Sequence, residues 1–570
     1  MQKERVAHKQ WLMMKNNAYP IVPALLLIVL TMAGLALMGI TSLTDPLAGG
    51  VSLTLKHYHT LLNQPGFWGN AFYSLYLAIA ASMLATVVGT LTAYGIATSE
   101  APVLRRLGEK VMQAGLVLPY LYAVFLAFLL LSQAGLLSRL LLALGVMDDP
   151  ASFPVLLFDS PGLGMIWVYG FKGIPFVTLM TLGVMIRINH QYRGVAQTLG
   201  AGGLQLLLKI YLPLSRRVIL WSCLVLFAFA LGSFEVSFFM SAFSPRPLAA
   251  TLYSLYLRPG VTSYYEAMAQ GMLMLAVGVV GAVVYLGLLN KLLQGLKTYG
   301  GGGLRLRHDL SRFWLLLLTV LWLVPMGYVV VYSFFAAIPF PDLLPRHFSF
   351  QFWEAVLKGN PLFFTALITS VQLALVTGFC TALLGLLASI SLSRMKQGAA
   401  LAWFSMISLP LFVPAMLLTF SLHLVMLRLS LANSRAAVLT AHVIISLPYA
   451  VAVLTAYLKG IGTGMEETAK TLGASPYYYY RKLLLPLVMP GLFFAFCIGF
   501  LLSFSELFSV LILGGGNVLT LSMLMYPAIT NSQWGTGAVL GSLFLFIHLS
   551  LFFMADHWVR RGVGPSDYLH

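Results

Sequence analysis

Long apolar stretches alternate with short polar segments along the whole of this chain. The apolar stretches are continuous over roughly 20 residues or more, which is the length of helix that crosses the ~30 Å hydrocarbon core of a bilayer. They lack the two-residue alternation of a membrane β-barrel. Backbone groups in lipid must find partners within their own segment, which leaves the helix. We therefore predict an all-α polytopic membrane protein with about twelve transmembrane helices. The predicted spans are 20–40, 70–97, 111–133, 163–187, 218–242, 268–290, 313–335, 362–392, 401–426, 437–458, 488–513 and 537–557.

Composition and charge agree with a membrane protein. Of the 570 residues, 59% are apolar and 9% are charged, whereas a soluble domain has about 25% charged residues. The net charge of +17 comes from the loops. With the N-terminus in the cytoplasm, 25 of the 34 Lys and Arg residues fall in segments on that side and eight in outer segments. The positive-inside rule therefore places both termini in the cytoplasm, and we expect a lipid bilayer around the chain and no nucleic-acid partner.

The N-terminal segment is similar to a signal peptide, with basic residues before an apolar run. The run from Ile21 to Ile40 is longer than the apolar region of a typical signal peptide, and further spans follow it. We therefore interpret this segment as a retained signal-anchor helix.

The chain divides into two halves of six spans. A basic segment, 291–312, separates them and contains four consecutive glycines, which is typical of a flexible linker. The predicted units are a first half at 1–290, the cytoplasmic linker at 291–312 and a second half at 313–570.

The two halves also match in sequence. Three pairs of residues lie at one offset of 273, called the repeat offset below: Pro175 and Pro448, Gly200 and Gly473, Pro213 and Pro486. Further matches are Ser74 with Ser370, Gly89 with Gly385 and Pro119 with Pro410, and we expect the matched prolines within spans to kink their helices. These matches indicate an internal repeat. Because each half has an even number of spans, the repeat is parallel, with its pseudo-two-fold axis along the membrane normal and its pathway between the halves.

Two polar loops, 194–213 and 467–486, occupy matched positions on the cytoplasmic side. Both contain T-L-G-A and end in L-P. In the second loop, Glu467 suits the first turn of a short helix and Gly473 suits its end. Ser475 and Pro476 then suit the start of the next helix.

The short helix of the second loop is predicted to lie across the membrane surface. Met465, Ala469 and Leu472 follow helical spacing and suit insertion into a groove of a partner protein. An ordinary interfacial loop is the alternative for one copy. Because there are two copies at matched positions, we predict a symmetric cytoplasmic partner.

The two loops resemble the E-A-A-x3-G-x9-I-x-L-P signature of permease subunits of binding-protein-dependent ABC importers. The second loop has Glu467, Ala469, Gly473, Leu483 and Pro486 at signature positions, and the first has Gly194, Ala196, Gly200, Ile210 and Pro213. The resemblance implies that both loops couple to a separate ATPase. The first loop has glycine where the signature has glutamate, so we expect the second loop to bind the ATPase more strongly.

The fused two-half layout resembles the ferric-iron and thiamine importer permeases of Gram-negative bacteria. The resemblance implies a multi-pass protein of the bacterial inner membrane, working with a cytoplasmic ABC ATPase dimer and a periplasmic solute-binding protein. The chain contains no G-x-x-x-x-G-K-[ST] motif for ATP and no spacing typical of metal ligands. We therefore expect a transport subunit and not an enzyme, without a cofactor or metal of its own, and with ATP bound by the partner.

Glu235 and Glu506 lie near the outer ends of equivalent spans, and an ionisable group inside a span is a functional candidate. One interpretation is a pair of pathway carboxylates suited to a cationic solute or to gating. The other is two carboxylates capped by local serines or reaching water. Lys172 is the one basic residue well inside a span; we expect it to pair with a glutamate or to extend toward the interface.

Two other functions remain open at this stage. An ion-gradient-driven secondary transporter explains the spans and the repeat but gives no reason for two polar loops. A membrane-embedded enzyme would use Glu235 and Glu506 as an acid–base pair, yet few other polar residues lie near them. The transported solute is open among ferric iron, thiamine, polyamines and oxyanions.

Overall fold

The computed structural model describes residues 21–47, 52–295, 308–335, 339–343, 347–462 and 464–562, with side chains left undescribed at 308–311 and 559–562. Helices make up nearly all of this part of the chain, and its β pairing is limited to two isolated bridges. Among the described residues, eleven helical stretches are long and apolar enough to cross a membrane. The prediction of an all-α polytopic membrane protein is confirmed. Gly300 to Gly303 of the predicted linker lie outside the described residues.

The described residues of the first half form twelve α-helices. They are α2 (Val22–Ser42), α3 (Lys56–Leu62), α4 (Phe67–Thr98), α5 (Pro102–Val117), α6 (Tyr120–Leu131), α7 (Leu136–Ala143), α8 (Leu163–Thr198), α9 (Gly203–Leu206), α10 (Leu212–Gly232), α11 (Phe234–Met240), α12 (Leu248–Tyr256) and α13 (Val261–Gly295).

The second half follows the same plan. Its helices are α14 (His308–Ser333), α15 (Gln351–Leu357), α16 (Phe363–Arg394), α17 (Gln397–Ile407), α18 (Ala415–Arg428), α19 (Arg435–Ile461), α20 (Gly464–Thr471), α21 (Pro476–Tyr478), α22 (Leu485–Ser505), α23 (Phe508–Leu513), α24 (Leu521–Thr530) and α25 (Trp534–Gly562).

Four predicted spans, the third, fifth, ninth and eleventh, each contain two helices rather than one, so those predictions are wrong. In the fifth, α10 and α11 are separated at Ser233, and in the eleventh, α22 and α23 are separated at Glu506 and Leu507. In the first half, α5 and α6 meet at Leu118 and Pro119. In the second half, α17 and α18 are separated by a short 3₁₀ turn that contains Pro410. Proline lacks the amide hydrogen and clashes with the preceding turn, which breaks a helix that hydrophobicity alone would continue. Pro175 and Pro448, by contrast, remain inside α8 and α19.

The two halves agree in their local detail. α10 and α22 have 21 residues each, and their first residues are separated by the repeat offset. The amide of the first residue of α12 donates to Ser74 Oγ at 2.7 Å, and the amide of the first residue of α24 donates to Ser370 Oγ at 2.7 Å. Gly89 lies against Val177 of α8, and Gly385 lies against the matching Ala450 of α19. The small residues let these helix pairs approach closely.

The first long helix described in each half also packs against the other half. α2 packs against α18 of the second half as well as α13, and α14 packs against α5 of the first half as well as α25. On α14, Trp322 stacks on Phe171 of α8 with ring centroids 5.3 Å apart, and its Nε1–H donates to the Phe171 carbonyl at 3.1 Å. The contact between the halves is therefore extensive.

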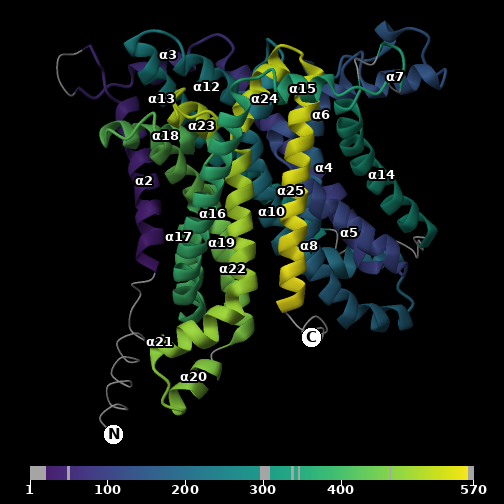
Figure 1. The fold of residues 1–570 in the computed structure, drawn as a ribbon, viewed down its shortest axis with the longest axis vertical. Helices are drawn as coiled ribbons and strands as arrows, with labels where there is room; N and C mark the ends of the chain where they lie inside the picture. The colour runs from purple at the N-terminus through teal and green to yellow at the C-terminus, as the bar shows by residue number, and fades with distance from the viewer. Residues whose placement is uncertain are drawn as a thin grey trace.

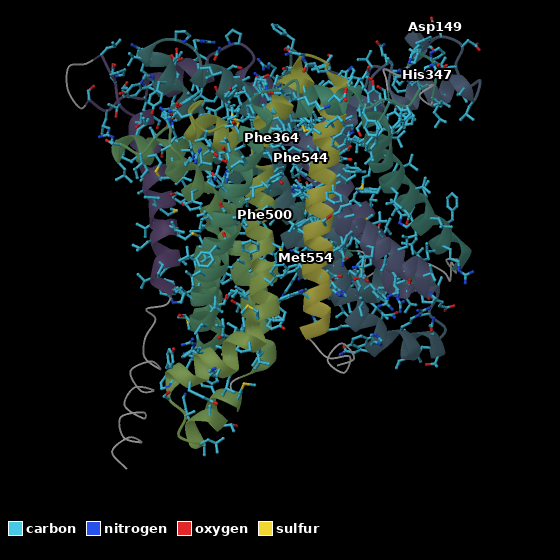
Figure 2. The ribbon with its side chains drawn as sticks, viewed as in Figure 1. Asp149, His347, Phe364, Phe500, Phe544 and Met554 are labelled. Atoms are coloured by element: carbon cyan, nitrogen blue, oxygen red, sulfur yellow. The ribbon has the colours of Figure 1, made fainter. Side chains whose placement is uncertain are left out.

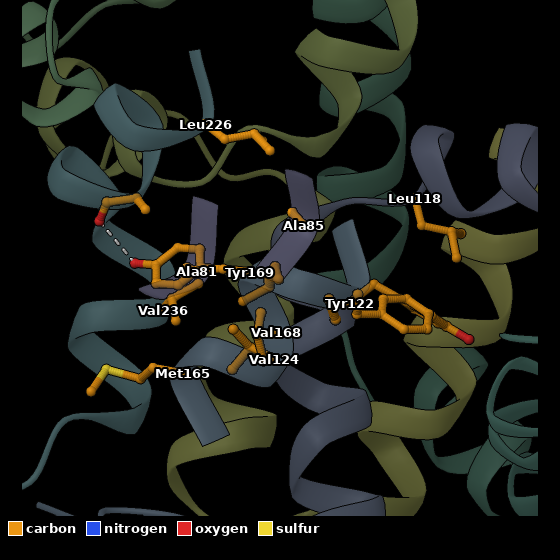
Figure 3. Packing of buried hydrophobic residues seen from close by; sticks show 14 of the residues in the cluster. Ala81, Ala85, Leu118, Tyr122, Val124, Met165, Val168, Tyr169, Leu226 and Val236 are labelled. Atoms are coloured by element: carbon orange, nitrogen blue, oxygen red, sulfur yellow. Dashed lines mark hydrogen bonds between the residues drawn. The ribbon is translucent and has the colours of Figure 1, made fainter. Parts of the chain in front are cut away.

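The body of the bundle is apolar and its two ends are polar. Figure 3 shows part of this packing, where Ala81 and Ala85 of α4 lie near Val168 and Tyr169 of α8. Phe544 of α25 lies within the bundle, whereas polar side chains gather at the ends (Figure 2).

The two ends of the molecule carry different elements (Figure 1). α20 and α21 lie at one end, and α3, α12, α15 and α24 lie at the opposite end. α2 begins and α25 ends toward the end that carries α20. This end is called the loop end below, and the opposite one the far end.

Candidate functional site

Both polar loops turn at a glycine with a left-handed backbone. Gly200 has φ +83° and Gly473 has φ +73°. The amide of Ala201 donates to the Ala196 carbonyl at 3.0 Å, and the amide of Ala474 donates to the Ala469 carbonyl at 2.9 Å. A residue with a Cβ rarely adopts this conformation, which ends a helix and satisfies its last carbonyls. The helix end predicted at Gly473 is confirmed, and the first loop has the same turn at Gly200.

The helix restart after the turn also follows the prediction in the second loop. Ser475 Oγ accepts a hydrogen bond from the amide of Tyr478 at 3.3 Å, and Pro476 is the first residue of α21. Both loops then pass through a π-helical segment, Leu207–Tyr211 in the first half and Tyr479–Leu484 in the second. Ile210 and Leu483 lie in these two segments. Pro213 and Pro486 are the second residues of α10 and α22.

The helices that lead into the loops differ. In the second half, α19 ends near Gly462, which has φ +75°, and α20 is a separate helix of eight residues. In the first half, α8 runs without a break for 36 residues to Thr198 and includes Gly194 and Ala196. The first loop thus has no separate short helix before its glycine.

The same two positions face inward and outward in both loops. Ala196 and Ala469 are buried, with 7% and 4% of their surfaces exposed, whereas Leu199 and Leu472 are 82% and 80% exposed. Ala469 packs inward on a cluster that includes Leu454. The prediction that Met465, Ala469 and Leu472 insert into a groove of a partner is therefore wrong for Ala469, which packs on the bundle, whereas Leu472 is exposed. Leu472 lies beyond the last residue of α20, where the turn directs it away from the helix.

An open depression lies beside the second turn. Its lining residues are Ala469, Leu472, Gly473, Ala474, Ser475, Tyr478 and Leu483. It brings together three of the predicted loop residues, Ala469, Gly473 and Leu483. Its walls are mostly apolar, and it is the right kind of surface for an apolar side chain of another protein.

The two glutamates at the start of α20 have different surroundings. Glu466 forms ion pairs with Arg394 of α16 at 3.0 Å and with Lys470 at 2.7 Å. Glu467 is exposed, and within the described residues its carboxylate takes part in no hydrogen bond or ion pair. Glu467 is thus available to another molecule, whereas Glu466 fastens the helix to the bundle.

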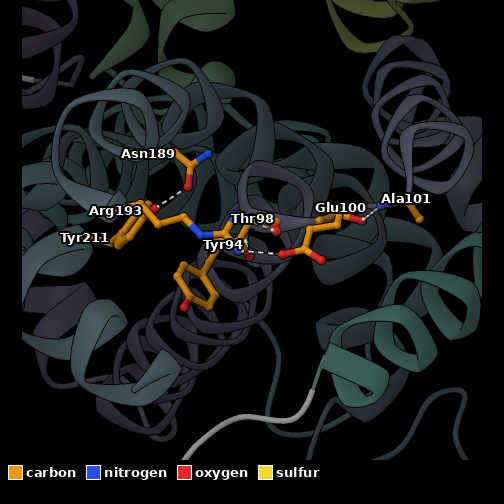
Figure 4. A network of polar contacts seen from close by, with 8 residues as sticks. Tyr94, Thr98, Glu100, Ala101, Asn189, Arg193 and Tyr211 are labelled. Atoms are coloured by element: carbon orange, nitrogen blue, oxygen red, sulfur yellow. Dashed lines mark hydrogen bonds and ion pairs between the residues drawn. The ribbon is translucent and has the colours of Figure 1, made fainter. Parts of the chain in front are cut away.

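A polar network fastens the first loop at the matching place (Figure 4). Arg193 donates to the Thr98 carbonyl at 3.1 Å and pairs with Glu100 at 3.2 Å. Tyr211 OH donates to Asn189 Oδ1 at 2.7 Å. The sequence interpretation missed Arg193, although the repeat offset matches it to Glu466 and could have revealed it.

The halves meet toward the far end through aromatic side chains. Phe234 of α11 and Phe508 of α23 have ring centroids 4.5 Å apart. Tyr256 of α12 lies 4.5 Å from Phe420 of α18, and its hydroxyl lies 2.8 Å from His423 Nδ1. α12, α18, α23 and α24 lie together on this side of the bundle in Figure 1. We call these contacts the aromatic seam; they close the space between the halves at this level.

The candidate pathway carboxylates flank the aromatic seam. Glu235 follows Phe234, and Glu506 lies two residues before Phe508; both carboxylates are partly buried. Glu506 accepts hydrogen bonds from the Ser509 amide at 3.2 Å and from Ser509 Oγ at 2.8 Å. Local serine capping, one of the two interpretations, therefore describes Glu506. The two glutamates come from opposite halves and approach one interface, but they do not occupy matched positions, because the repeat offset pairs Glu506 with Ser233.

Lys172 makes a contact that the sequence did not predict. Its Nζ donates to the carbonyls of Gly115 at 3.1 Å, Leu116 at 2.6 Å and Leu118. These carbonyls lie where α5 ends, and the last carbonyls of a helix lack partners within it. A cation at this end is also favoured by the helix dipole. Lys172 therefore secures the break between α5 and α6, and the expected glutamate pair or extension to the interface is wrong.

A second polar group that the sequence did not single out is His442 of α19. Its Nδ1 lies 2.7 Å from Ser503 Oγ, and its Nε2 lies 3.0 Å from Ser509 Oγ. Ser509 in turn contacts Glu506. A lone histidine in an apolar helix carries no signal of such a network, because its partners come from α22 and α23. No group of three or more metal-ligating side chains occurs among the described residues.

Part of the chain is similar in sequence to known proteins. Residues 381–562 match the family model described as binding-protein-dependent transport system inner membrane component. The trehalose transport system permease protein SugB of Mycobacterium tuberculosis is 27% identical over 166 residues, which are 29% of this chain and 60% of the relative. The spermidine/putrescine transport system permease protein PotC of Escherichia coli is 27% identical over 154 residues, or 27% of this chain and 58% of the relative.

A third relative, the putrescine transport system permease protein PotI of Escherichia coli, is 27% identical over 188 residues, or 31% of this chain and 67% of the relative. The chain thus spans about three fifths of the length of the first two relatives. All three are named as transport permeases, in agreement with the prediction of a transport subunit, and the 570-residue length is consistent with a fused two-half form. Residues 381–562 thus match the model of this permease family, and the resemblance of the chain to type I ABC importer permeases is confirmed.

Proposed function

We propose that this chain is the transmembrane subunit of an ATP-driven importer of the bacterial inner membrane. Its two polar loops would bind a cytoplasmic ATPase dimer, and its outer face would receive solute from a periplasmic binding protein. The observation that carries the proposal is the pair of matched turns. Each has a left-handed glycine, a buried alanine and an exposed leucine at equivalent positions in the two halves.

A loop that served only to connect two spans would not need this surface. Exposed leucines recur at one position of the repeat, Leu199 and Leu472, and this recurrence on both loops supports a role in contact with another protein. A dimeric partner presents two equal surfaces, as an ATPase dimer does. The open depression beside Leu472 and the exposed carboxylate of Glu467 add polar and apolar contacts on the second loop.

Coupling would follow from the different affinity of each ATPase state for the two conformations of the permease. When ATP closes the ATPase dimer, the two loops would be drawn together, and the halves would separate at the aromatic seam. Such a ligand changes the equilibrium only by its difference in affinity for the two states. Glu235 and Glu506 would then line the opened space.

For the solute, we propose a cation. Two carboxylates from opposite halves flank the space between them, aromatic rings surround it, and both features favour positive charge. Two of the three relatives are named for spermidine or putrescine and one for trehalose. Uptake of a linear diamine should therefore exceed that of the uncharged diol of equal length, and alanine at both glutamates should reduce it. Unchanged uptake in that double variant would contradict the role of the carboxylates.

Transport assays in vesicles separate this proposal from an ion-gradient-driven carrier. The ATPase and the chain are reconstituted together, and uptake is measured with internal ATP, without ATP, and with an imposed ion gradient alone. We expect uptake to require ATP. Uptake driven by the gradient alone, at a rate equal to that with ATP, would favour the secondary transporter.

A further inference from the structure

Each loop is attached to the loop end of one long helix. Arg193 precedes the first loop and Glu466 precedes the second, and the repeat offset matches their positions. The helices that they contact, α4 and α16, both have 32 residues and end at Thr98 and Arg394. The two attachments thus join the same elements of the repeat.

In the first half, the loop supplies the cation. The Arg193 guanidinium donates to the Thr98 carbonyl, at the C-terminus of α4, and pairs with Glu100 just beyond it. A positive charge at this place compensates the unpaired carbonyls and the negative end of the helix dipole. The Arg193 side chain is 19% exposed.

In the second half, the helix supplies the cation. Arg394 is itself the last residue of α16, so the C-terminus of this helix already carries a positive charge. The loop position now holds Glu466, which pairs with Arg394 at 3.0 Å and is 14% exposed. The ion pair therefore lies at the matching place in both halves, but the residue that the loop contributes has the opposite charge.

A second attachment follows each turn. In the first half, Tyr94 of α4 donates from its hydroxyl to the Gly203 carbonyl at 2.8 Å and lies 5.0 Å from the ring of Tyr211. In the second half, Arg394 donates to the Tyr480 hydroxyl and lies 5.5 Å from its ring centroid. Each turn is thus held to its long helix on both sides, before and after the glycine.

The far ends of the same two helices are attached as well. Ser74 of α4 and Ser370 of α16 accept hydrogen bonds from the first amides of α12 and α24. Of these two short helices, α12 carries Tyr256 of the aromatic seam. α24 carries Tyr526, which stacks on Phe238 with ring centroids 5.6 Å apart, and Phe238 stacks in turn on Phe234 of the seam. α4 and α16 thus connect the loops at one end with the seam at the other.

We propose that Arg193 and Glu466 are positioning residues whose charge-swapped ion pairs make each loop move together with α4 or α16. We call the two sets of contacts the loop clasps. The clasps rest on the proposed function, because they transmit to the aromatic seam a movement that the ATPase imposes on the loops. Without a clasp, the loop would still bind the ATPase but would shift relative to its helix.

Ion pairs on a protein surface often contribute little, but the clasps differ from such pairs. Arg193 and Arg394 each contact a backbone or aromatic group in addition to a carboxylate, and the pairs recur at matched positions despite opposite charges. The pair between Lys358 and Glu354 provides a contrast. It joins neighbouring turns of one short helix, with 79% and 63% of the two side chains exposed, and its disruption serves as the control.

The first test uses the chain without the ATPase. Spin labels replace Leu472 on the loop and Gln397 next to the end of α16, and the distance distribution between them is measured. We expect a narrow distribution with the natural clasp, and one about twofold broader or more in E466R, which faces Arg394 and Lys470. E466Q should broaden the distance distribution less than E466R does. If E466R does not fold, the comparison of E466Q with the natural chain serves as the test. K358E should change nothing.

A variant that carries the residues of the first clasp at the matching positions of the second half, called the transplant below, tests whether the attachment can be restored. The variant R394T/K396E/E466R/K470Q places the residues found at positions 98, 100, 193 and 197 at the matching positions of the second half. We expect this variant to regain the narrow distribution. Equal distributions in the natural chain, E466R and E466Q would contradict the clasp.

The second test adds the ATPase and counts ATP hydrolysed per solute transported. We expect about tenfold more ATP per solute for E466R, an unchanged affinity for the ATPase, and recovery to within about twofold in the transplant. If E466R forms the complex and hydrolyses as much ATP per solute as the natural chain, the proposed role of the clasp is contradicted. If the natural chain does not bind the ATPase, the proposed function is contradicted instead. The distance measurement, which needs no ATPase, still tests whether the clasp attaches the loop to its helix.

Discussion

The first and second halves of this molecule share much of their backbone geometry but differ in the helix that leads into each loop and in their polar side chains. Matched turns, matched π-helical segments and serine contacts at the far end recur at fixed offsets. At the same places the first half has Arg193 and Lys172, whereas the second has Glu466 and Ile445. A repeated fold thus needs the same backbone geometry, but different side chains can satisfy the same local demand.

The loop clasps show this most clearly. The C-terminus of each long helix favours a positive charge. Once Arg394 supplies it from the helix itself, the loop position must carry a carboxylate to remain attached. The charge of the loop residue is therefore a consequence of where the cation is placed, and not a separate feature.

The largest expected difference between the halves concerns deletion of the loops. Removal of Glu467 to Ser475 should abolish solute-stimulated ATP hydrolysis, because it removes Glu467 and much of the open depression. Removal of the matching residues, 194–202, should leave a measurable part of it. Both deletions should insert normally into the membrane, which is checked by yield and monodispersity. Equal losses would contradict the stronger role of the second loop.

The exposed leucines test what the loops have in common. Leu472→Asp and Leu199→Asp should each weaken binding of the ATPase about tenfold or more, since each puts a carboxylate into an apolar contact. A tenfold change corresponds to about 1.4 kcal/mol. Binding is measured by titration of the purified ATPase. A substitution at exposed Leu257, near the far end, should have no effect, and an equal effect there would point to a general loss of structure.

Replacement of Lys172, which contacts the break between α5 and α6, should destabilise the protein more than replacement of its match in the second half. Lys172→Met should destabilise the protein by about 1–3 kcal/mol, because carbonyls at the end of α5 lose their partner. Ile445→Met at the matching position should cost less than about 1.5 kcal/mol. Thermal unfolding in detergent measures both. Equal destabilisation by the two substitutions would show that Lys172 acts only by filling space.

The smallest effect should be the same in both halves. Ser74→Ala and Ser370→Ala each leave the first amide of α12 or α24 without its acceptor, at a cost of about 1 kcal/mol. The same unfolding experiment should find them within about 0.5 kcal/mol of each other, the spread expected of equivalent hydrogen bonds. A large difference would mean that the two far-end contacts are not equivalent.

The membrane spans and the two glycine turns could be predicted from the sequence, each for a physical reason. Continuous apolar runs predict spans because lipid admits only internally paired helices, and Gly200 and Gly473 predicted the turns because few other residues adopt that backbone conformation. The breaks near Pro119 and Pro410 were underestimated, because a proline at a span centre can either kink or end a helix. The partners of Lys172, His442 and Arg193 lie on other helices, so no local pattern indicated them.

The proposed function requires that ATP hydrolysis drive transport through the two loops. Gly473→Pro tests it most directly, because proline requires φ near −65° whereas Gly473 has φ +73°. Hydrolysis by the reconstituted ATPase is measured with and without solute and its binding protein. We predict that the variant inserts normally and loses solute stimulation by about tenfold or more. Wild-type stimulation in a correctly inserted Gly473→Pro protein would contradict this requirement.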